Sequence, residues 1–510
     1  MTETKYLVLF DTDHIHEYLF ATNKLKEIRG ASVMLDRLNI RYIRWLADKC
    51  NGKEIYVGGG GGKFWFENLT NAQKFCSMSE QLYSRKTIIA SLTTSIVKEN
   101  TKYEFHEFLE LAEKQLRRKK SMKQITTQLD TNSYFKFCEL CCTYPATKER
   151  EIGTESKTLV CNACYNKFRA LGLRSQIYKD FEDSLSFKID REKNYPADLT
   201  EIGNCLNSNG YVGYIYADGN GIGKILQGIL KAGDNKEEKL SKFSYQIDKA
   251  TKHGIIRAVK NYIPEPVSTI SESRENVKIF PVEFIMAGGD DLITAVPATK
   301  ALEIAADFCN NFSKLFEENF GPVNGNTVTT SCGVVIAKSS YPINLVFKQA
   351  EQLLKSAKKL GKQALLTDQK AQIESAIDFS VIKSTATGNL EAIRKDEFEL
   401  DQGERLLTER PYTIDKLNEL IDFIRECKNY SLPNNKLKTM QQSLFESVNQ
   451  ASLDYLKIIS RFHNEKLKTL FKEKLIEFDP IPWRIKTNKT TTPFLDFVEI
   501  YDFVTDKINE

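Results

Sequence analysis

The sequence predicts an α+β protein in which a strand–helix–hairpin unit occurs twice, with a four-cysteine segment between the two copies and a helical region after the second. Short apolar runs with Gly-rich connections recur around residues 5–66 and 211–296. Two Cys-x₂-Cys pairs lie between them, and helical spacing of apolar residues dominates after residue 376. We therefore expect four regions, with the bounds 1–130, 131–194, 195–375 and 376–510.

The second unit contains an acidic hairpin within residues 284–296. Two runs rich in Ile, Val and Thr flank Gly288, Gly289, Asp290 and Asp291, and the glycines supply the positive φ angles that a tight hairpin needs. Gly and Asp are also the commonest residues of an ordinary polar turn. Adjacent carboxylates repel each other unless a cation or a raised pKa relieves them, so the alternatives are a plain turn and a divalent-metal site.

A second carboxylate favours the metal site, because an apolar strand in the same unit ends at Asp218. The turn that follows contains Gly219, Asn220 and Gly221, and a helix is expected from near Ile222. Exposed backbone N–H groups at such a turn form a phosphate cradle beside the strand-end carboxylate. This arrangement suits nucleotide chemistry.

Two other Gly-rich motifs do not fit this turn. A dinucleotide fingerprint fails because Lys224 stands where the third glycine belongs. A P-loop fails because Asp218 and Ile225 occupy its Gly and Ser/Thr positions.

The order of these elements resembles the ferredoxin-like palm domain of polymerases and nucleotide cyclases. The resemblance implies that Asp218, Asp290 and Asp291 are catalytic and hold Mg²⁺ or Mn²⁺. Two such ions bridge the triphosphate of one nucleotide and the attacking hydroxyl of another, so no protein nucleophile is required. Further along the chain, Lys358 and Lys362 are expected to meet the triphosphate, and Ser331 to line the base pocket.

The resemblance becomes specific because it covers several segments of the second unit and extends to the N-terminus. Residues 214–224, 284–296, 330–337 and 341–362 resemble the second palm of the polymerase–cyclase large subunit of type III CRISPR effector complexes. Residues 7–13 and 26–38, the latter with an Arg-Gly-x-Ser helix, resemble the first palm of that family.

The first palm has a degenerate hairpin, in which Gly59, Gly60 and Gly61 stand in place of the acidic pair. Asp11 and Asp13 are possible metal ligands, but no carboxylate remains on this hairpin to complete a site. We therefore expect the first palm to hold a nucleotide, because glycines without a Cβ let a base or phosphate approach closely.

The segment between the palms predicts a zinc ribbon. Cys138 and Cys141 form one knuckle, Cys161 and Cys164 form another, and nineteen residues separate them. Four thiolates close the tetrahedron, so we expect a structural Zn²⁺, with Cys142 as an alternative ligand to Cys141. The other cysteines are scattered, as free thiols of a reducing compartment are, which predicts a cytoplasmic protein.

The composition limits the partners that the protein can be expected to bind. The 510 residues are 41% hydrophobic, and a net charge of +4 is too small to indicate nucleic-acid binding except through local basic runs, such as residues 114–120 and 466–474. No apolar run approaches the roughly 18 residues of a transmembrane helix, so we expect a soluble protein without a membrane partner.

By resemblance, the protein is a nucleotidyltransferase that converts ATP into cyclic oligoadenylates, in a complex with other type III CRISPR subunits, crRNA and a target RNA that acts as trigger. Many family members begin with a His-Asp nuclease domain. The first palm starts here near Met1 and the chain has five histidines, so no DNase activity is expected.

Two further functions stay open. The same palm can adenylylate another acceptor or make a dinucleotide signal outside CRISPR, or the chain can be a non-catalytic RNA-binding scaffold. The retained carboxylates favour an enzyme, because a like-charge cluster is costly without a cation.

Overall fold

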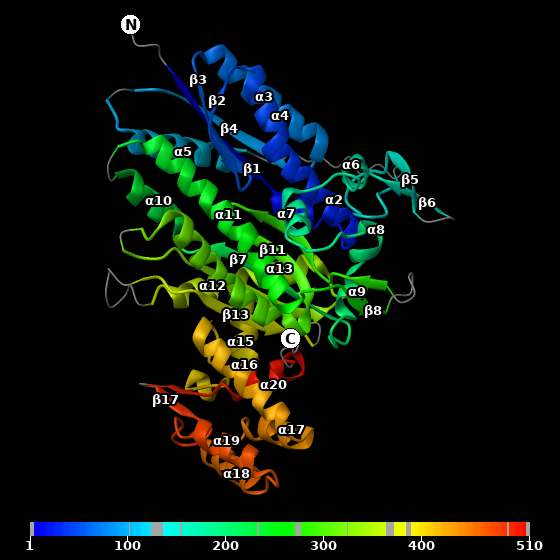
Figure 1. Cartoon of the computed structure of the whole chain (residues 1–510), viewed down its shortest axis with the longest axis vertical. Coiled ribbons are helices and arrows are strands. Elements are labelled where there is room, and N and C mark those ends of the chain that lie inside the picture. Colours follow the sequence, from blue (N-terminus) through cyan, green and yellow to red (C-terminus); the bar gives the residue numbers. More distant parts are fainter. Residues whose placement is uncertain are drawn as a thin grey trace.

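The computed structural model describes residues 5–100, 102–123, 136–152, 156–231, 234–270, 277–323, 325–363, 372–383, 389–486 and 489–505. The molecule is elongated, with the N-terminal sheet at one end, a larger sheet in the middle and a mainly helical region at the other end (Figure 1). This order confirms the predicted α+β class with a helical C-terminal region.

The first palm is a four-stranded antiparallel sheet in the order β2-β3-β1-β4. Its strands are β1 (Tyr6–Asp13), β2 (Lys53–Gly58), β3 (Gly61–Phe66) and β4 (Ser91–Lys98). Its helices are α1 (Ile15–Leu19), α2 (Leu25–Asp36), α3 (Ile43–Lys49), α4 (Leu69–Thr87) and α5 (Phe105–Met122). A π-helical segment, η1 (Arg37–Tyr42), joins α2 directly to α3.

The second palm is a six-stranded sheet in the order β10-β11-β7-β12-β13-β16. Its strands are β7 (Tyr211–Gly219), β10 (Glu283–Gly288), β11 (Asp291–Pro297), β12 (Thr330–Lys338), β13 (Ala376–Val381) and β16 (Tyr412–Thr413). Its helices are α10 (Ile222–Lys231), α11 (Lys236–Tyr262), α12 (Ala301–Phe320), preceded by the short turn η2 (Ala298–Lys300), and α13 (Ile343–Gly361).

The strand registers show that the two palms are copies of one unit. Each hairpin carries a β-bulge at the same place, between Glu54 and Tyr56 in the first and between Phe284 and Met286 in the second. In the first sheet Asp11 lies opposite Gly61; in the second, Ala217 pairs with Leu292, which sets the next residue, Asp218, beside Asp291. Asp11 is thus the counterpart of Asp218, and the hairpin glycines are the counterparts of the acidic pair.

The segment between the palms packs against both of them. It contains β5 (Lys148–Ile152), β6 (Ser156–Val160), α6 (Asn162–Ala170), α7 (Gln176–Asp183), α8 (Arg191–Asn194) and α9 (Leu199–Gly203). Helix α6 crosses α2 so closely that a Cβ on Gly30 would lie 2.0 Å from the carbonyl oxygen of Lys167, so only glycine fits there. The predicted boundary at residue 130 lies outside the described residues.

The C-terminal region is less purely helical than predicted. Its helices are α15 (Leu390–Phe398), α16 (Ile414–Asn429), α17 (Asn434–Ser443), α18 (Val448–Ser460), α19 (Glu465–Leu475) and α20 (Phe494–Ile500), with short helical turns η3 (Asp401–Gly403) and η4 (Tyr501–Phe503). Small strands β14 (Glu399–Leu400), β15 (Arg405–Leu406), β17 (Arg484–Lys486) and β18 (Lys489–Thr491) form a separate sheet. β13 and β16 also fall after residue 375, yet they extend the second palm's sheet, because the apolar residues 376–381 bury themselves beside β12.

Two apolar cores meet at the second palm's sheet. Ile215, Ala217 and Leu292 belong to a core shared with α11, α12 and the C-terminal helices, whereas Tyr214 and Ile293 belong to a core shared with the first palm. A two-stranded ribbon, β8 (Val267–Thr269) with β9 (Val277–Ile279), lies near α9 (Figure 1). Among the described helices, none has the length and apolar character to cross a bilayer.

Candidate functional site

The two palms touch through the tips of their hairpins. Gly59 and Gly289 both adopt left-handed φ angles, of 58° and 62°. A Cβ on Gly59 would lie 3.2 Å from the Cα of Gly289, and a Cβ on Gly289 would lie 3.1 Å from the Cα of Gly59. The missing side chain at Gly59 therefore admits the other hairpin, and its predicted contact with a nucleotide stays a prediction.

The three predicted catalytic carboxyls come from adjacent strand ends. Asp218 is the penultimate residue of β7, Asp290 lies in the hairpin turn and Asp291 begins β11. Burial, then the charge and hydrogen bonding of Asp218, raise the pKa of Asp290 to about 7. Burial, then the charges of Asp218 and Asp290, raise the pKa of Asp291 to about 8. The three groups are close enough to repel one another.

Lys358, near the end of α13, supplies a positive charge to this cluster. Its ammonium donates to the Asp218 carboxylate and to the Gly219 carbonyl oxygen, the latter at 2.8 Å. Its charge partly opposes the rise in the pKa values of Asp290 and Asp291. Among the described residues, the three carboxyls do not form a group as tight as the four cysteines below, so Mg²⁺ binding stays a prediction.

The other residues predicted to contact the nucleotide differ in burial: two are buried and one is exposed. Asn220 is 1% exposed, and its side chain bonds to Thr329 Oγ1 at 3.0 Å and to Ser331 Oγ at 3.1 Å. Ser331 is also fully buried, so both residues hold β7 to its neighbour β12. Their predicted contacts with a phosphate and a base stay predictions, because in this structure both side chains bond to neighbouring residues of the protein. Lys362 follows the last residue of α13 and is exposed.

The remaining glycines of the site serve the turns. A Cβ on Gly219 would lie 3.0 Å from the Cβ of Asp290, which explains the glycine there. Gly221 has a φ of 67° and precedes α10. Gly288 ends β10 with ordinary φ, so only Gly289 of the pair provides the left-handed turn.

Two cavities flank the hairpin contact, and Gly59 lines both. The larger, of about 370 Å³, is lined by Asp11, Gly61, Lys63 and Arg117 of the first palm and by Asp290 and α11 residues of the second. The smaller, of about 80 Å³, is lined by Asn39, Gly60, Gly288 and Asp291 among others. Each cavity thus joins one palm's hairpin to the other palm's helices.

The first palm neutralises its own acidic residues. Lys120 Nζ on α5 lies 2.6 Å from Asp11 Oδ2 and 2.8 Å from Asp13 Oδ1. Lys123 Nζ lies 3.4 Å from Asp13 Oδ2. Hydrogen bonds and charge from Lys120 hold the pKa of Asp13 below its usual value, although burial opposes them. In this structure ammonium groups therefore compensate the charges of both carboxylates.

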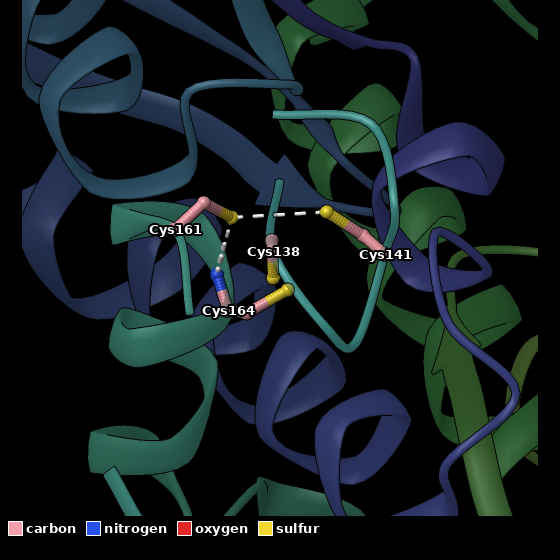
Figure 2. Close-up of side chains that lie close together, drawn as sticks. All are labelled: Cys138, Cys141, Cys161 and Cys164. Carbon is pink, nitrogen blue, oxygen red and sulfur yellow. Dashed lines mark hydrogen bonds between the residues drawn. The ribbon is translucent and has the colours of Figure 1, made fainter. Parts of the chain in front are cut away.

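The four predicted zinc ligands do converge (Figure 2). The sulfur atoms of Cys138, Cys141, Cys161 and Cys164 all lie within 4.8 Å of one another. Cys141 Sγ and Cys161 Sγ are 3.8 Å apart, close to the roughly 3.8 Å that a tetrahedral site with Zn–S bonds of about 2.3 Å requires. Cys142 is exposed and lies outside this group, so the four-cysteine set fits a structural Zn²⁺ without it.

Two residues with structural roles at this site were not assigned from the sequence. Asp248 on α11 accepts from the Gly289 backbone N–H at 3.0 Å and fixes the second hairpin's turn. Arg29 donates from Nε to both carboxylate oxygens of buried Glu283, at 3.0 and 3.2 Å, and ties α2 to β10. The Arg-Gly-x-Ser resemblance pointed to Arg29; nothing near Asp248 in the sequence marks it.

Comparison with known proteins supports this architecture. The family described as Cas10/Cmr2, second palm domain, matches residues 211–366. No curated protein matches the chain. A crystal structure of a Csm1-Csm4 cassette in complex with pppApApA is similar over 98% of this chain and 69% of its own, at 13% identity and a TM-score of 0.58. A cassette in complex with one ATP is similar over 99% of this chain and 70% of its own, at 14% identity and a TM-score of 0.57. A cassette in complex with cA4 is similar over 98% of this chain and 69% of its own, at 14% identity and a TM-score of 0.55. Residues 211–366 therefore match the second palm domain of the Cas10/Cmr2 family, and the chain as a whole has a fold similar to that found in the Csm1-Csm4 cassettes.

Proposed function

We propose that the protein is a nucleotidyltransferase that makes cyclic oligoadenylates from ATP. Asp218, Asp290 and Asp291 would hold Mg²⁺ or Mn²⁺, which supplies Lewis-acid stabilisation of the transferring phosphoryl group. The observation that carries the proposal is the meeting of these three carboxyls at adjacent strand ends, beside a cavity between the palms. Lys358 stands next to them and would bind the triphosphate.

The first palm would hold the second nucleotide. Its cavity of about 370 Å³ contains Lys63 and Arg117, and Asp290 of the other palm lines the same space. A nucleotide held there would place a ribose hydroxyl near the second palm's carboxyls. Because Lys120 already neutralises Asp11 and Asp13, this palm would bind without its own metal pair.

The similar structures support adenine nucleotides as substrates, since they are complexes of Csm1-Csm4 with ATP, pppApApA and cA4. By the same similarity, we propose a Csm4-like partner subunit, crRNA and a target RNA in a type III CRISPR complex.

A binding-only scaffold is the second candidate, and one observation favours it. Lys358 already pairs with Asp218, so its ammonium compensates the charge that a metal ion would otherwise compensate. In a scaffold this pair would persist in the presence of ATP and Mg²⁺; in an enzyme Lys358 would move to the phosphates.

The test is mass spectrometry of ATP incubated with Mg²⁺, the assembled complex and target RNA. We expect cyclic oligoadenylates from the wild type and none from an Asp290→Asn/Asp291→Asn variant, because uncompensated charge on the phosphoryl group costs several kcal/mol, at least about 10³-fold in rate. Asp396→Asn, an exposed change on α15, is the matched control and should keep full activity. Linear or differently linked products would assign another acceptor, and no product in the wild type would favour the scaffold.

A further inference from the structure

A cationic cavity lies between the palms on a different side of α11 from the larger nucleotide cavity. It has a volume of about 480 Å³. Arg37 and Arg41 of η1 form one wall, Lys249 and Lys252 of α11 form the opposite wall, and α7 contributes Lys179. Cations outnumber the three carboxylates on its lining, so the cavity carries a net positive charge.

Several of these cations have no internal counter-charge. Lys252 pairs with Asp248 at 2.7 Å, but Arg37, Arg41 and Lys249 form no ion pair with a carboxylate of the described residues. The Nε of Arg37 is buried and, within the part of the chain that the structure describes, has no hydrogen-bond partner. A buried donor without an acceptor is costly, and the unpaired charges of Arg37, Arg41 and Lys249 suit an anion from outside the chain.

Exposed aromatic rings stand at the margins of the same cavity. A neighbouring hollow of about 290 Å³ is lined by Arg37, Arg41, Tyr42 and Trp45, so the two spaces share both arginines. Trp45 is 49% exposed, and Tyr245, which lines the main cavity, is 60% exposed. Cationic walls that follow a phosphate backbone, with aromatic rings on which bases stack, are the chemistry of single-strand recognition.

The cavity adjoins the proposed catalytic site. Asp36, Ile40, Asp248 and Lys252 line both this cavity and the small cavity that contains Asp291. The π-helical η1 carries Arg37 and Arg41, and such segments are frequent at functional sites. The cavity at Asp291, the cationic cavity and the hollow at Trp45 therefore follow one another along shared lining residues.

We propose that this cavity and the hollow at Trp45 form a groove for a short single-stranded oligonucleotide, with phosphates on Arg37, Arg41 and Lys249 and a base on Trp45. The origin of that strand rests on the proposed function: a linear intermediate of ATP oligomerisation is one source, and single-stranded RNA of the complex is the other. A purely solvated basic surface does not account for a cavity of about 480 Å³ with cations on facing helices.

The binding test uses the full chain without added divalent cation, so that metal-dependent binding at the carboxyls is absent. The probe is a fluorescently labelled linear 5′-triphosphorylated triadenylate, measured by anisotropy at several salt concentrations. Each phosphate neutralised on a single strand contributes about 0.7 to the slope of log affinity against log salt, so Arg37→Ser/Arg41→Ser should lower the slope by about 1.4. Lys438→Ser/Arg461→Ser, two exposed cations of the C-terminal helices, is the matched control and should leave the slope unchanged.

Trp45 provides an independent readout, because it is the exposed one of three tryptophans; Trp65 and Trp483 are 8% and 0% exposed. An unlabelled strand should quench its emission, and Trp45→Ala should weaken binding about fivefold or more. Equal competition by a 5′-hydroxyl RNA of the same length assigns the groove to RNA, whereas preference for the triphosphorylated strand assigns it to intermediates.

Equal affinity and slope in Arg37→Ser/Arg41→Ser and its control, or unchanged Trp45 emission on binding, would overturn the groove. This outcome is distinct from failure of the proposed function. A wild type that makes no cyclic product leaves the metal-free binding readouts intact.

Discussion

The two palms share a register, a bulge and a glycine-tipped hairpin, yet they manage negative charge in opposite ways. In the first palm, Lys120 reaches both Asp11 and Asp13, and the hairpin has no carboxylate. In the second, three carboxyls face one ammonium, that of Lys358, and burial with mutual repulsion raises two of their pKa values. An internally neutralised site has no need of a metal ion, whereas the second palm has a deficit of positive charge that a divalent cation would fill.

The largest expected effect concerns the zinc ribbon, which packs on the first palm through α2 and α6. Cys138→Ser should destabilise the ribbon by several kcal/mol, because structural Zn²⁺ contributes on the order of 10 kcal/mol to folding of small sites. Hydrogen exchange should rise in residues 25–49 of the first palm and stay unchanged in β7. Cys142→Ser, at an exposed position outside the cluster, should change neither. A uniform rise across both palms would mean that the ribbon supports the whole molecule.

The next effect concerns the bond between the palms. Arg29→Met leaves Glu283 buried without its partner and should lower the free energy of unfolding by about 3–5 kcal/mol. Arg44→Met removes a more exposed pair with Glu54 and should cost about 0.2–1 kcal/mol. Denaturant unfolding measures both losses of free energy. Similar losses for the two variants would show that the pair with Glu283 stabilises the protein no more than the exposed pair does.

A smaller effect tests the contact of the hairpins. Gly59→Ala places a Cβ against Gly289 at a positive φ and should cost about 1–3 kcal/mol of strain while it pushes the hairpins apart. We expect the rate of product formation to fall by more than the loss of folding free energy alone would cause. Gly223→Ala on α10 meets no atom within 4 Å and should be neutral or stabilising by up to about 1 kcal/mol. Full activity in Gly59→Ala would show that the hairpin contact is dispensable.

The smallest effect separates two lysines of one helix. Lys358→Ala should raise the KM for ATP about tenfold, because a charge-assisted contact with the triphosphate is lost. Lys362→Ala should change it less than about twofold, since Lys362 is exposed at the helix end. Equal effects would support the predicted contact of Lys362 with the triphosphate.

Local patterns predicted most of the fold, and tertiary packing decided what they missed. Strand alternation, glycine turns and cysteine spacing are local, so the palms, the hairpins and the four zinc ligands were predictable. The burial of Asn220 and Ser331 was not predictable, because their neighbours in sequence do not show that these side chains bond to each other and to Thr329. Residues 376–381 were missed as a strand because their burial depends on β12, which lies about forty residues away in the chain. Asp248 was missed because its partner, Gly289, lies on another element.

The most direct test compares the equivalent aspartates of the two palms. Asp218→Asn and Asp11→Asn remove one charge each from counterpart positions, and product formation from ATP and Mg²⁺ is measured for both in the assembled, RNA-triggered complex. The account predicts a loss of at least about 10³-fold for Asp218→Asn and less than about tenfold for Asp11→Asn, because only the second palm depends on a metal ion. Equal losses, or a larger loss for Asp11→Asn, would contradict the assignment of catalysis to the second palm.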